Sequence, residues 1–167
     1  MLAPGYRKLV VPPNSKRLLN PPTVLLIENS PATAKLIVDA LARIVPPEAV
    51  RICADGAEAL DFFRCRGAYL NRNALELPAL VLLSLDLPRI SGLDVLREIR
   101  ADPATRLLPV TMLSASDRRE DIRLAAGLGA NSYVRKSADG RQMTGNIIEL
   151  ARYWLELNVP PPARARQ

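Results

Sequence analysis

Polar side chains that can take part in chemistry follow each apolar run of this 167-residue sequence. They are Glu28-Asn29, Asp55, Ser84 with Asp86, Ser114-Ala115 and Arg135-Lys136. A carboxylate such as Glu28 or Asp86 is the hard oxygen ligand that Mg²⁺ prefers. A lysine in a dry pocket needs an anionic partner, and either carboxylate is available to Lys136. A serine hydroxyl without a nearby base is a poor nucleophile, so Ser84 does not predict covalent catalysis.

The composition excludes several kinds of site. The chain has no histidine, which rules out Ser-His-Asp and Cys-His nucleophile systems, a His-ligated metal and a histidine phosphocarrier. Its two cysteines, Cys53 and Cys65, make neither a zinc site by themselves nor the framework of a disulfide-rich secreted protein. We interpret them as a buried strand residue and a residue at a helix end.

Short apolar runs alternate with helical patterns along the chain. Strands are predicted over 23–28, 49–54, 79–84, 109–114 and 132–135, and helices over 31–45, 57–66, 93–101, 117–127 and 140–157, with a long loop over 67–78. Repeated βα units predict an α/β fold, a doubly wound five-stranded parallel sheet in three layers. Ligands of such a sheet bind at the carboxyl ends of its strands, where the polar groups lie.

The basic charge belongs to the two ends of the chain. The formal net charge is +6, and residues 23–157 carry as many acids as bases. We therefore divide the chain into a basic, Pro-rich N-terminal arm (1–22), a domain (23–157) and a basic C-terminal tail (158–167). Neither a secretory signal nor an apolar membrane span is evident in the sequence, so a cytoplasmic location without membrane contact is expected.

Several motifs of the domain resemble a response-regulator receiver domain. They are Val24-Leu-Leu-Ile-Glu28-Asn29-Ser30-Pro31, Asp55-Gly56-Ala-Glu-Ala-Leu60, Leu87-Pro-Arg-Ile-Ser-Gly92, Pro109-Val-Thr-Met-Leu-Ser114, Gly129-Ala-Asn-Ser-Tyr133 and Lys136. The loop with Gly67-Ala68-Tyr69 and the ending Tyr153-Trp154-Leu155-Glu156 resemble the single-domain regulators associated with phytochrome-type sensor kinases. The resemblance implies the CheY-like, flavodoxin-like (βα)5 fold.

The resemblance also implies roles for the residues at the strand ends, and two acidic ones have been replaced. Receivers hold an acidic pair after the first strand that binds Mg²⁺, and here Glu28 is followed by Asn29. Ser84 occupies the position of the phosphoacceptor aspartate. Asp86, two residues later, is the alternative acceptor and, with Glu28, the remaining metal ligand. The alternative role for Asp86 is a loop carboxylate that pairs with Lys136 or caps local backbone.

The other family positions are retained. Ser114, followed by Ala115 at the pocket, matches the hydroxyl that binds the phosphoryl group, and Lys136 matches the lysine that contacts phosphoryl oxygens. Lys136 is expected in a structural ion pair. Tyr133 matches the aromatic switch residue, and we expect a half-buried ring beside the last helix. Trp154 lies on an apolar stripe of that helix and is a candidate interface residue.

These residues predict a single-domain regulator of two-component phosphorelay signalling that has become a pseudo-receiver. It is expected to be no enzyme, to need no cofactor, and to bind Mg²⁺ only weakly. Its expected partners are proteins, a sensor kinase or a downstream signalling protein, and a second copy of itself. The alternatives are a conventional receiver that a histidine kinase phosphorylates on Asp86, and a nucleic-acid-binding protein that uses its basic arms. The last is not favoured, because no aromatic residues interleave the bases and no helix-turn-helix is evident.

Overall fold

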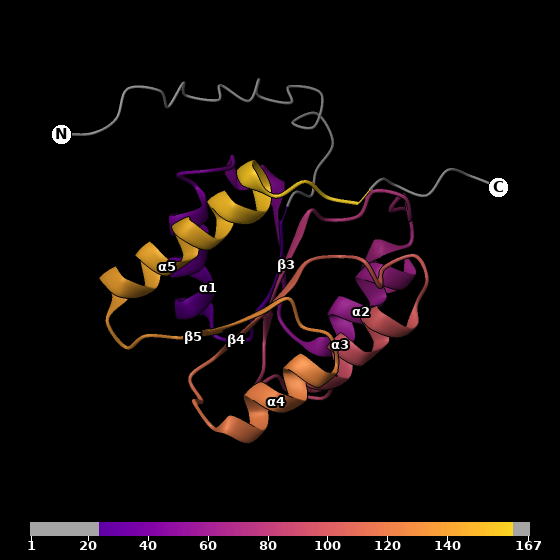
Figure 1. The fold of residues 1–167 in the computed structure, drawn as a ribbon. Coiled ribbons are helices and arrows are strands. Elements are labelled where there is room, and N and C mark those ends of the chain that lie inside the picture. Colours follow the sequence, from indigo (N-terminus) through magenta and orange to yellow (C-terminus); the bar gives the residue numbers. More distant parts are fainter. Residues whose placement is uncertain (1–23, 162–167) are drawn as a thin grey trace, which may run out of the picture.

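The computed structural model describes residues 24–161 of the chain (Figure 1). The strands are β1 (Val24–Ile27), β2 (Val50–Cys53), β3 (Leu80–Ser84), β4 (Val110–Ser114) and β5 (Ser132–Arg135). The helices are α1 (Pro31–Leu41), α2 (Gly56–Arg64), α3 (Gly92–Ala101), α4 (Arg119–Gly127) and α5 (Gly140–Arg152). Short turns of other helix types cover Pro47–Ala49, Gly67–Tyr69 and Tyr153–Leu157. The predicted N-terminal arm lies outside the described residues, as does the tail beyond residue 161.

The five strands form one parallel sheet in the order β2-β1-β3-β4-β5. From β1 the chain moves to one edge of the sheet for β2 and then returns past β1 to β3, β4 and β5. The order of strands therefore reverses between β1 and β3, and ligands of such sheets bind at the carboxyl ends of the strands beside this reversal. The predicted doubly wound α/β fold is confirmed. Every residue of β1, β3 and β4 is buried, which explains why these strands read as continuous apolar runs.

Helices cover both faces of the sheet (Figure 1). α1 and α5 pack on one face against alternate strand residues such as Val24 and Leu26. α2, α3 and α4 pack on the other face, against Leu25 and Ile27. Successive side chains of each strand point to opposite faces of the sheet, so they contribute to two separate apolar cores, one on each side. Both cores stop at the carboxyl ends of the strands, where polar residues begin.

Caps and one close contact fix where the strand ends meet the helices. The Ser30 hydroxyl accepts a hydrogen bond from Thr33 N and so begins α1, as predicted. Ser91 caps α3 in the same way through Asp94 N. At Gly92, a Cβ atom would lie 2.1 Å from the Ser84 carbonyl oxygen, so only glycine lets α3 begin this close to the end of β3. The start of α3 therefore lies directly against the backbone of Ser84 and Leu85.

Several predicted helix boundaries differ from the structure, among them the end of α2, which lies at Arg64 and not at residue 66. α1 ends at Leu41, because residues 42–45 form a tighter turn before the prolines at 46 and 47. α4 begins at Arg119 and not at 117, because the loop before it makes its own hydrogen bonds. The last predicted helix is continuous through residue 157, but its final turn, Tyr153–Leu157, is a π-helix. The loop over 67–78 contains the turn Gly67–Tyr69.

Within residues 24–161, no helix is long and apolar enough to cross a membrane.

Candidate functional site

An ion pair with one hydroxyl neighbour occupies the carboxyl edge of the sheet. Lys136, just after β5, places its Nζ atom 2.6 Å from Oε2 of Glu28 and 2.8 Å from Oγ of Ser84. Glu28 follows β1, and Ser84 ends β3. The Glu28 side chain is 1% exposed and that of Lys136 is 19% exposed. The ion pair predicted for Lys136 is present, and Glu28 is its partner.

Backbone groups complete the contacts of this cluster. The second carboxylate oxygen of Glu28, Oε1, accepts a hydrogen bond of 2.9 Å from the Ser30 backbone N–H. The backbone N–H of Lys136 donates to the Ser114 carbonyl oxygen at 2.7 Å. Both Glu28 oxygens are therefore engaged, one by an ammonium and one by an amide. A buried carboxylate that is this fully bonded is held in place by its neighbours.

The residues of this pocket do not fit a divalent metal site. Mg²⁺ requires several oxygen ligands in octahedral geometry, most of them from carboxylates, carbonyls or water. Glu28 is the only carboxylate in the Lys136 cluster, and its Oε2 lies against a positive charge. Asn29 is exposed, as is Asp86. Throughout residues 24–161, no group of three or more acidic, cysteine or histidine side chains is arranged to hold a metal ion.

The contact between Ser84 and Lys136 does not make a nucleophile. A Ser-Lys pair works in catalysis when the amine is neutral and accepts the serine proton. Here the Lys136 ammonium donates to the Glu28 carboxylate, and an ammonium has no lone pair to accept a proton. Ser84 is 1% exposed, so a substrate would not reach its hydroxyl in this arrangement. In this arrangement Ser84 accepts a hydrogen bond from Lys136.

The structure does not bring Asp86 into the cluster. Its side chain is exposed in the loop after β3, and Lys136 pairs with Glu28 instead. The expectation that Asp86 pairs with Lys136 or caps local backbone is therefore wrong, because the chain turns outward after the buried Leu85. Asp55, the strand-end acid of β2, caps α2 through Glu58 N and forms an ion pair with Arg89. It too lies apart from Lys136.

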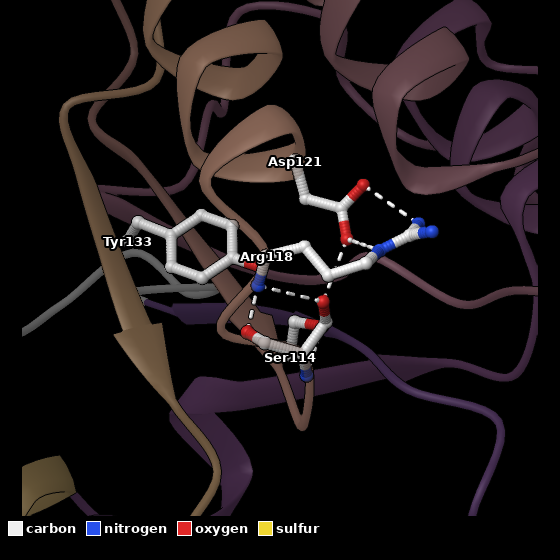
Figure 2. A network of polar contacts seen from close by, with 5 residues as sticks. Ser114, Arg118, Asp121 and Tyr133 are labelled. Atoms are coloured by element: carbon white, nitrogen blue, oxygen red, sulfur yellow. Dashed lines mark hydrogen bonds and ion pairs between the residues drawn. The ribbon is translucent and has the colours of Figure 1, made fainter.

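A second polar network surrounds the loop between β4 and α4 (Figure 2). The Ser114 hydroxyl accepts a hydrogen bond of 3.0 Å from the backbone N–H of Ser116. The Ser116 hydroxyl donates to Asp121 at 2.7 Å, and Arg118 donates two hydrogen bonds to the same carboxylate. Hydrogen bonds from Arg118, and then from Ser116, hold the pKa of the Asp121 carboxyl below its usual value. Ala115, in the same loop, is exposed.

Tyr133 joins this network from β5. Its hydroxyl donates to the Ser116 carbonyl oxygen at 3.0 Å, and its ring is half-buried. The ring packs with the core under α2, α3 and α4, so the expected place beside the last helix is wrong. The reason is the alternation along β5, in which Val134 and not Tyr133 faces α5. Trp154 packs at the edge of the α1–α5 core, with its ring 5.0 Å from that of Tyr153.

Sequence reasoning missed Ser116, Arg118 and Asp121. All three lie in the predicted region around the start of α4, but none matches a family position named above. The available signal was spacing: an arginine and an aspartate three residues apart face each other on a first helical turn. The role of Ser116 depends on a loop conformation and leaves no pattern in the sequence.

Comparison with known proteins identifies the family to which the chain belongs. The family model of the response regulator receiver domain matches residues 24–148, so the chain belongs to that family. It is a receiver domain of two-component signalling, as the resemblance implied.

More particular relatives are phytochrome response regulators. The response regulator Rcp1 of Synechocystis sp. is 32% identical over 145 residues, which cover 86% of this chain and 97% of Rcp1. The phosphorylated cyanobacterial phytochrome response regulator RcpA has a TM-score of 0.77 and 35% identity, and the match covers 83% of this chain and 97% of RcpA. The Mn²⁺-bound form of Rcp1 has a TM-score of 0.77 and 30% identity over 85% of this chain and all of that chain (100%). The chain is therefore related to single-domain phytochrome response regulators.

Proposed function

We propose that this protein is a single-domain pseudo-receiver, which signals through protein–protein contacts that do not depend on phosphorylation. The observation that carries the proposal is the Lys136 ammonium, which lies between Glu28 and a serine at the acceptor position. A receiver takes phosphate as an acyl phosphate, and an acyl phosphate needs a carboxylate. Ser84 offers none.

The electrostatics of the pocket support the same proposal. A buried cation–anion pair is already neutral, so the cluster has no unpaired negative charge to attract Mg²⁺. RcpA is phosphorylated and Rcp1 holds Mn²⁺ in their own structures. This chain keeps their fold, while its acceptor position and the second member of its acidic pair are Ser84 and Asn29.

The proposed partners are proteins: a sensor kinase, a downstream signalling protein, or a second copy of the chain. Relatives of the family act in signalling, and the cluster of Glu28, Ser84 and Lys136 contains no activated nucleophile or general base. We therefore propose no enzymatic activity. The exposed side chains around the end of α5, including Tyr153, are available for a contact with another protein.

Labelled acetyl phosphate with Mg²⁺ tests the proposal. The wild-type chain is expected to take up no acid-labile, hydroxylamine-sensitive label, the signature of an acyl phosphate. The double variant Asn29→Asp/Ser84→Asp, which restores both family carboxylates, is the positive control for the reagents. Label on the wild-type chain that disappears in Asp86→Asn would overturn the proposal and establish a conventional receiver that uses Asp86.

A further inference from the structure

Ser116 is the centre of the network between β4 and α4. Its backbone N–H donates to Ser114 Oγ at 3.0 Å, and its carbonyl accepts from the Tyr133 hydroxyl at 3.0 Å. Its own hydroxyl donates to Asp121 Oδ2 at 2.7 Å and accepts from the Arg118 backbone N–H at 3.2 Å. Every polar group of this residue is engaged, and the partners come from β4, β5 and α4.

Asp121 anchors the network to α4. Its side chain is 8% exposed and lies in the first turn of the helix, where the helix dipole favours a negative charge. Arg118 donates from Nε to Oδ2 at 3.0 Å and from Nη2 to Oδ1 at 2.9 Å, a two-pronged contact that fixes the carboxylate plane. Figure 2 shows the guanidinium and the carboxylate facing each other, with the Tyr133 ring on the other side of the loop.

We propose that the Asp121–Arg118 pair, acting through Ser116, holds the Tyr133 hydroxyl at the β4–α4 loop without any phosphoryl group. The inference rests on the proposed function, because it names what sets the loop of a receiver that takes no phosphate. The surface formed by α4 and β5 is then presented in one arrangement at all times.

Ser114 ties one end of the loop without any phosphoryl group. The resemblance implies that this hydroxyl would bind phosphoryl oxygen, whereas here its oxygen accepts the Ser116 N–H inside its own loop. The loop that carries the Tyr133 acceptor is tied at both ends, to Ser114 on β4 and to Asp121 on α4. A hydrogen bond to a charged carboxylate is the stronger of these ties. Loss of that bond is expected to free the loop.

The variant Ser116→Ala tests this device. It removes only the hydroxyl and leaves the backbone N–H for Ser114 and the carbonyl for Tyr133. Hydrogen exchange of the backbone amide at position 116 is expected to become about tenfold faster or more, as expected for the loss of a hydrogen bond to a charged group. The ring signals of Tyr133 in the NMR spectrum are expected to broaden or shift towards those of an exposed ring.

Ser137→Ala is the matched control. The Ser137 hydroxyl also donates at 2.7 Å, to Gln142 Oε1, and also accepts from a backbone N–H two residues later, that of Asp139. Its loss is expected to leave the exchange at position 116 and the Tyr133 signals unchanged. A second variant, Asp121→Asn, weakens the anchor without changing its size and is expected to act in the same direction as Ser116→Ala.

Unchanged exchange at position 116 and unchanged Tyr133 signals in both Ser116→Ala and Asp121→Asn would overturn the inference. Its failure is distinguishable from failure of the proposed function, because these measurements use no phosphate. Label from acetyl phosphate on a wild-type chain whose Tyr133 still moves in Ser116→Ala would instead contradict the pseudo-receiver and leave the loop device in place.

Discussion

The Nζ atom of Lys136 lies within 2.8 Å of two side-chain oxygens, and one belongs to a carboxylate that is 1% exposed. Two charges so far from water are stable together and costly apart. At the scale of single residues, Lys136 thus has one charged partner, Glu28, and one neutral partner, Ser84. Glu28, which the family resemblance assigns to metal binding, becomes the counter-ion of the lysine.

The substitution Glu28→Gln tests this ion pair. It leaves the Lys136 ammonium without a charged partner, so the free energy of unfolding is expected to fall by about 2–3 kcal/mol. This is less than the roughly 3–5 kcal/mol of a fully buried pair, because Lys136 is 19% exposed. Urea denaturation measures it. The control Glu98→Gln breaks an exposed pair with Arg64 and is expected to cost less than about 0.5 kcal/mol.

A double-mutant cycle then separates the pair from its parts. The variant Glu28→Gln/Lys136→Met removes both charges, and its loss of stability is expected to be clearly smaller than the sum of the two single losses. Additive losses would show that the two charges do not stabilise each other.

The two cysteines differ in environment and should differ in reactivity. Burial raises the pKa of the Cys53 thiol from 9.0 to about 12, while Cys65 is only half-buried. At pH 8, one thiol is expected to react quickly with Ellman's reagent and the second only after unfolding in urea. Fast reaction of both thiols in the native protein would contradict this burial.

The same shift gives a pH dependence with a defined sign. A neutral thiol with a raised folded-state pKa stabilises the fold fully below pH 9, and the contribution is lost as the pH rises from 9 towards 12. Between pH 8 and pH 10, the wild-type chain is therefore expected to lose about 1 kcal/mol of stability relative to Cys53→Val. An equal loss of stability in both proteins would show that ionisation of Cys53 does not cause the pH dependence.

At the scale of elements, the start of α3 decides where the acceptor position lies. Gly92 allows the helix to begin against the end of β3. A Cβ atom added at this residue would lie only 2.1 Å from the Ser84 carbonyl oxygen. The contact involves backbone on both sides, and backbone yields less readily than the tip of a side chain. The pocket geometry therefore depends on a residue that makes no polar side-chain contact at all.

The substitution Gly92→Ala is expected to lower the free energy of unfolding by about 2–4 kcal/mol, because the added methyl group overlaps backbone atoms. Gly145→Ala in α5 is the matched control, since a Cβ there meets nothing within 4 Å. That control is expected to gain about 0.5–1 kcal/mol from helix propensity. Thermal unfolding of both variants gives the comparison, and equal effects would contradict the close contact.

The sheet and an ion pair of Lys136 were predictable from the sequence, whereas the choice of Glu28 over Asp86 and the loop network were not. Apolar runs such as Leu80–Ser84 indicate buried parallel strands, and parallel strands bring their carboxyl ends together, so Lys136 was expected near the strand-end carboxylates. The outward turn at Asp86 and the engagement of Ser116 depend on loop torsion angles. Such angles follow from tertiary contacts and leave no period in the sequence.

At the scale of the whole molecule, charge divides between the domain and the ends of the chain. Residues 23–157 are neutral, and the formal charge of +6 comes from the arm and the tail. Binding to nucleic acid through the domain would require a basic face with phosphate contacts. The domain as a whole carries no excess of positive charge.

We therefore expect the full-length protein not to retard duplex DNA in a gel-shift experiment at about 0.15 M salt, where non-specific binding is already screened. The protein lacking residues 1–22 is expected to behave in the same way. Retardation by the full-length chain that decreases steeply with salt and disappears on that deletion would support a nucleic-acid role for the arm.

We propose that Lys136, Glu28 and Ser84 form a closed cluster in place of a phosphoryl and metal site. A crystal structure of the protein soaked with Mg²⁺ and beryllofluoride, a phosphoryl mimic, is the decisive experiment. We expect no metal and no fluoride at the carboxyl ends of β1 and β3, with Lys136 still bonded to Glu28. Bound Mg²⁺ and beryllofluoride, at Asp86 or beside Ser84, would contradict it.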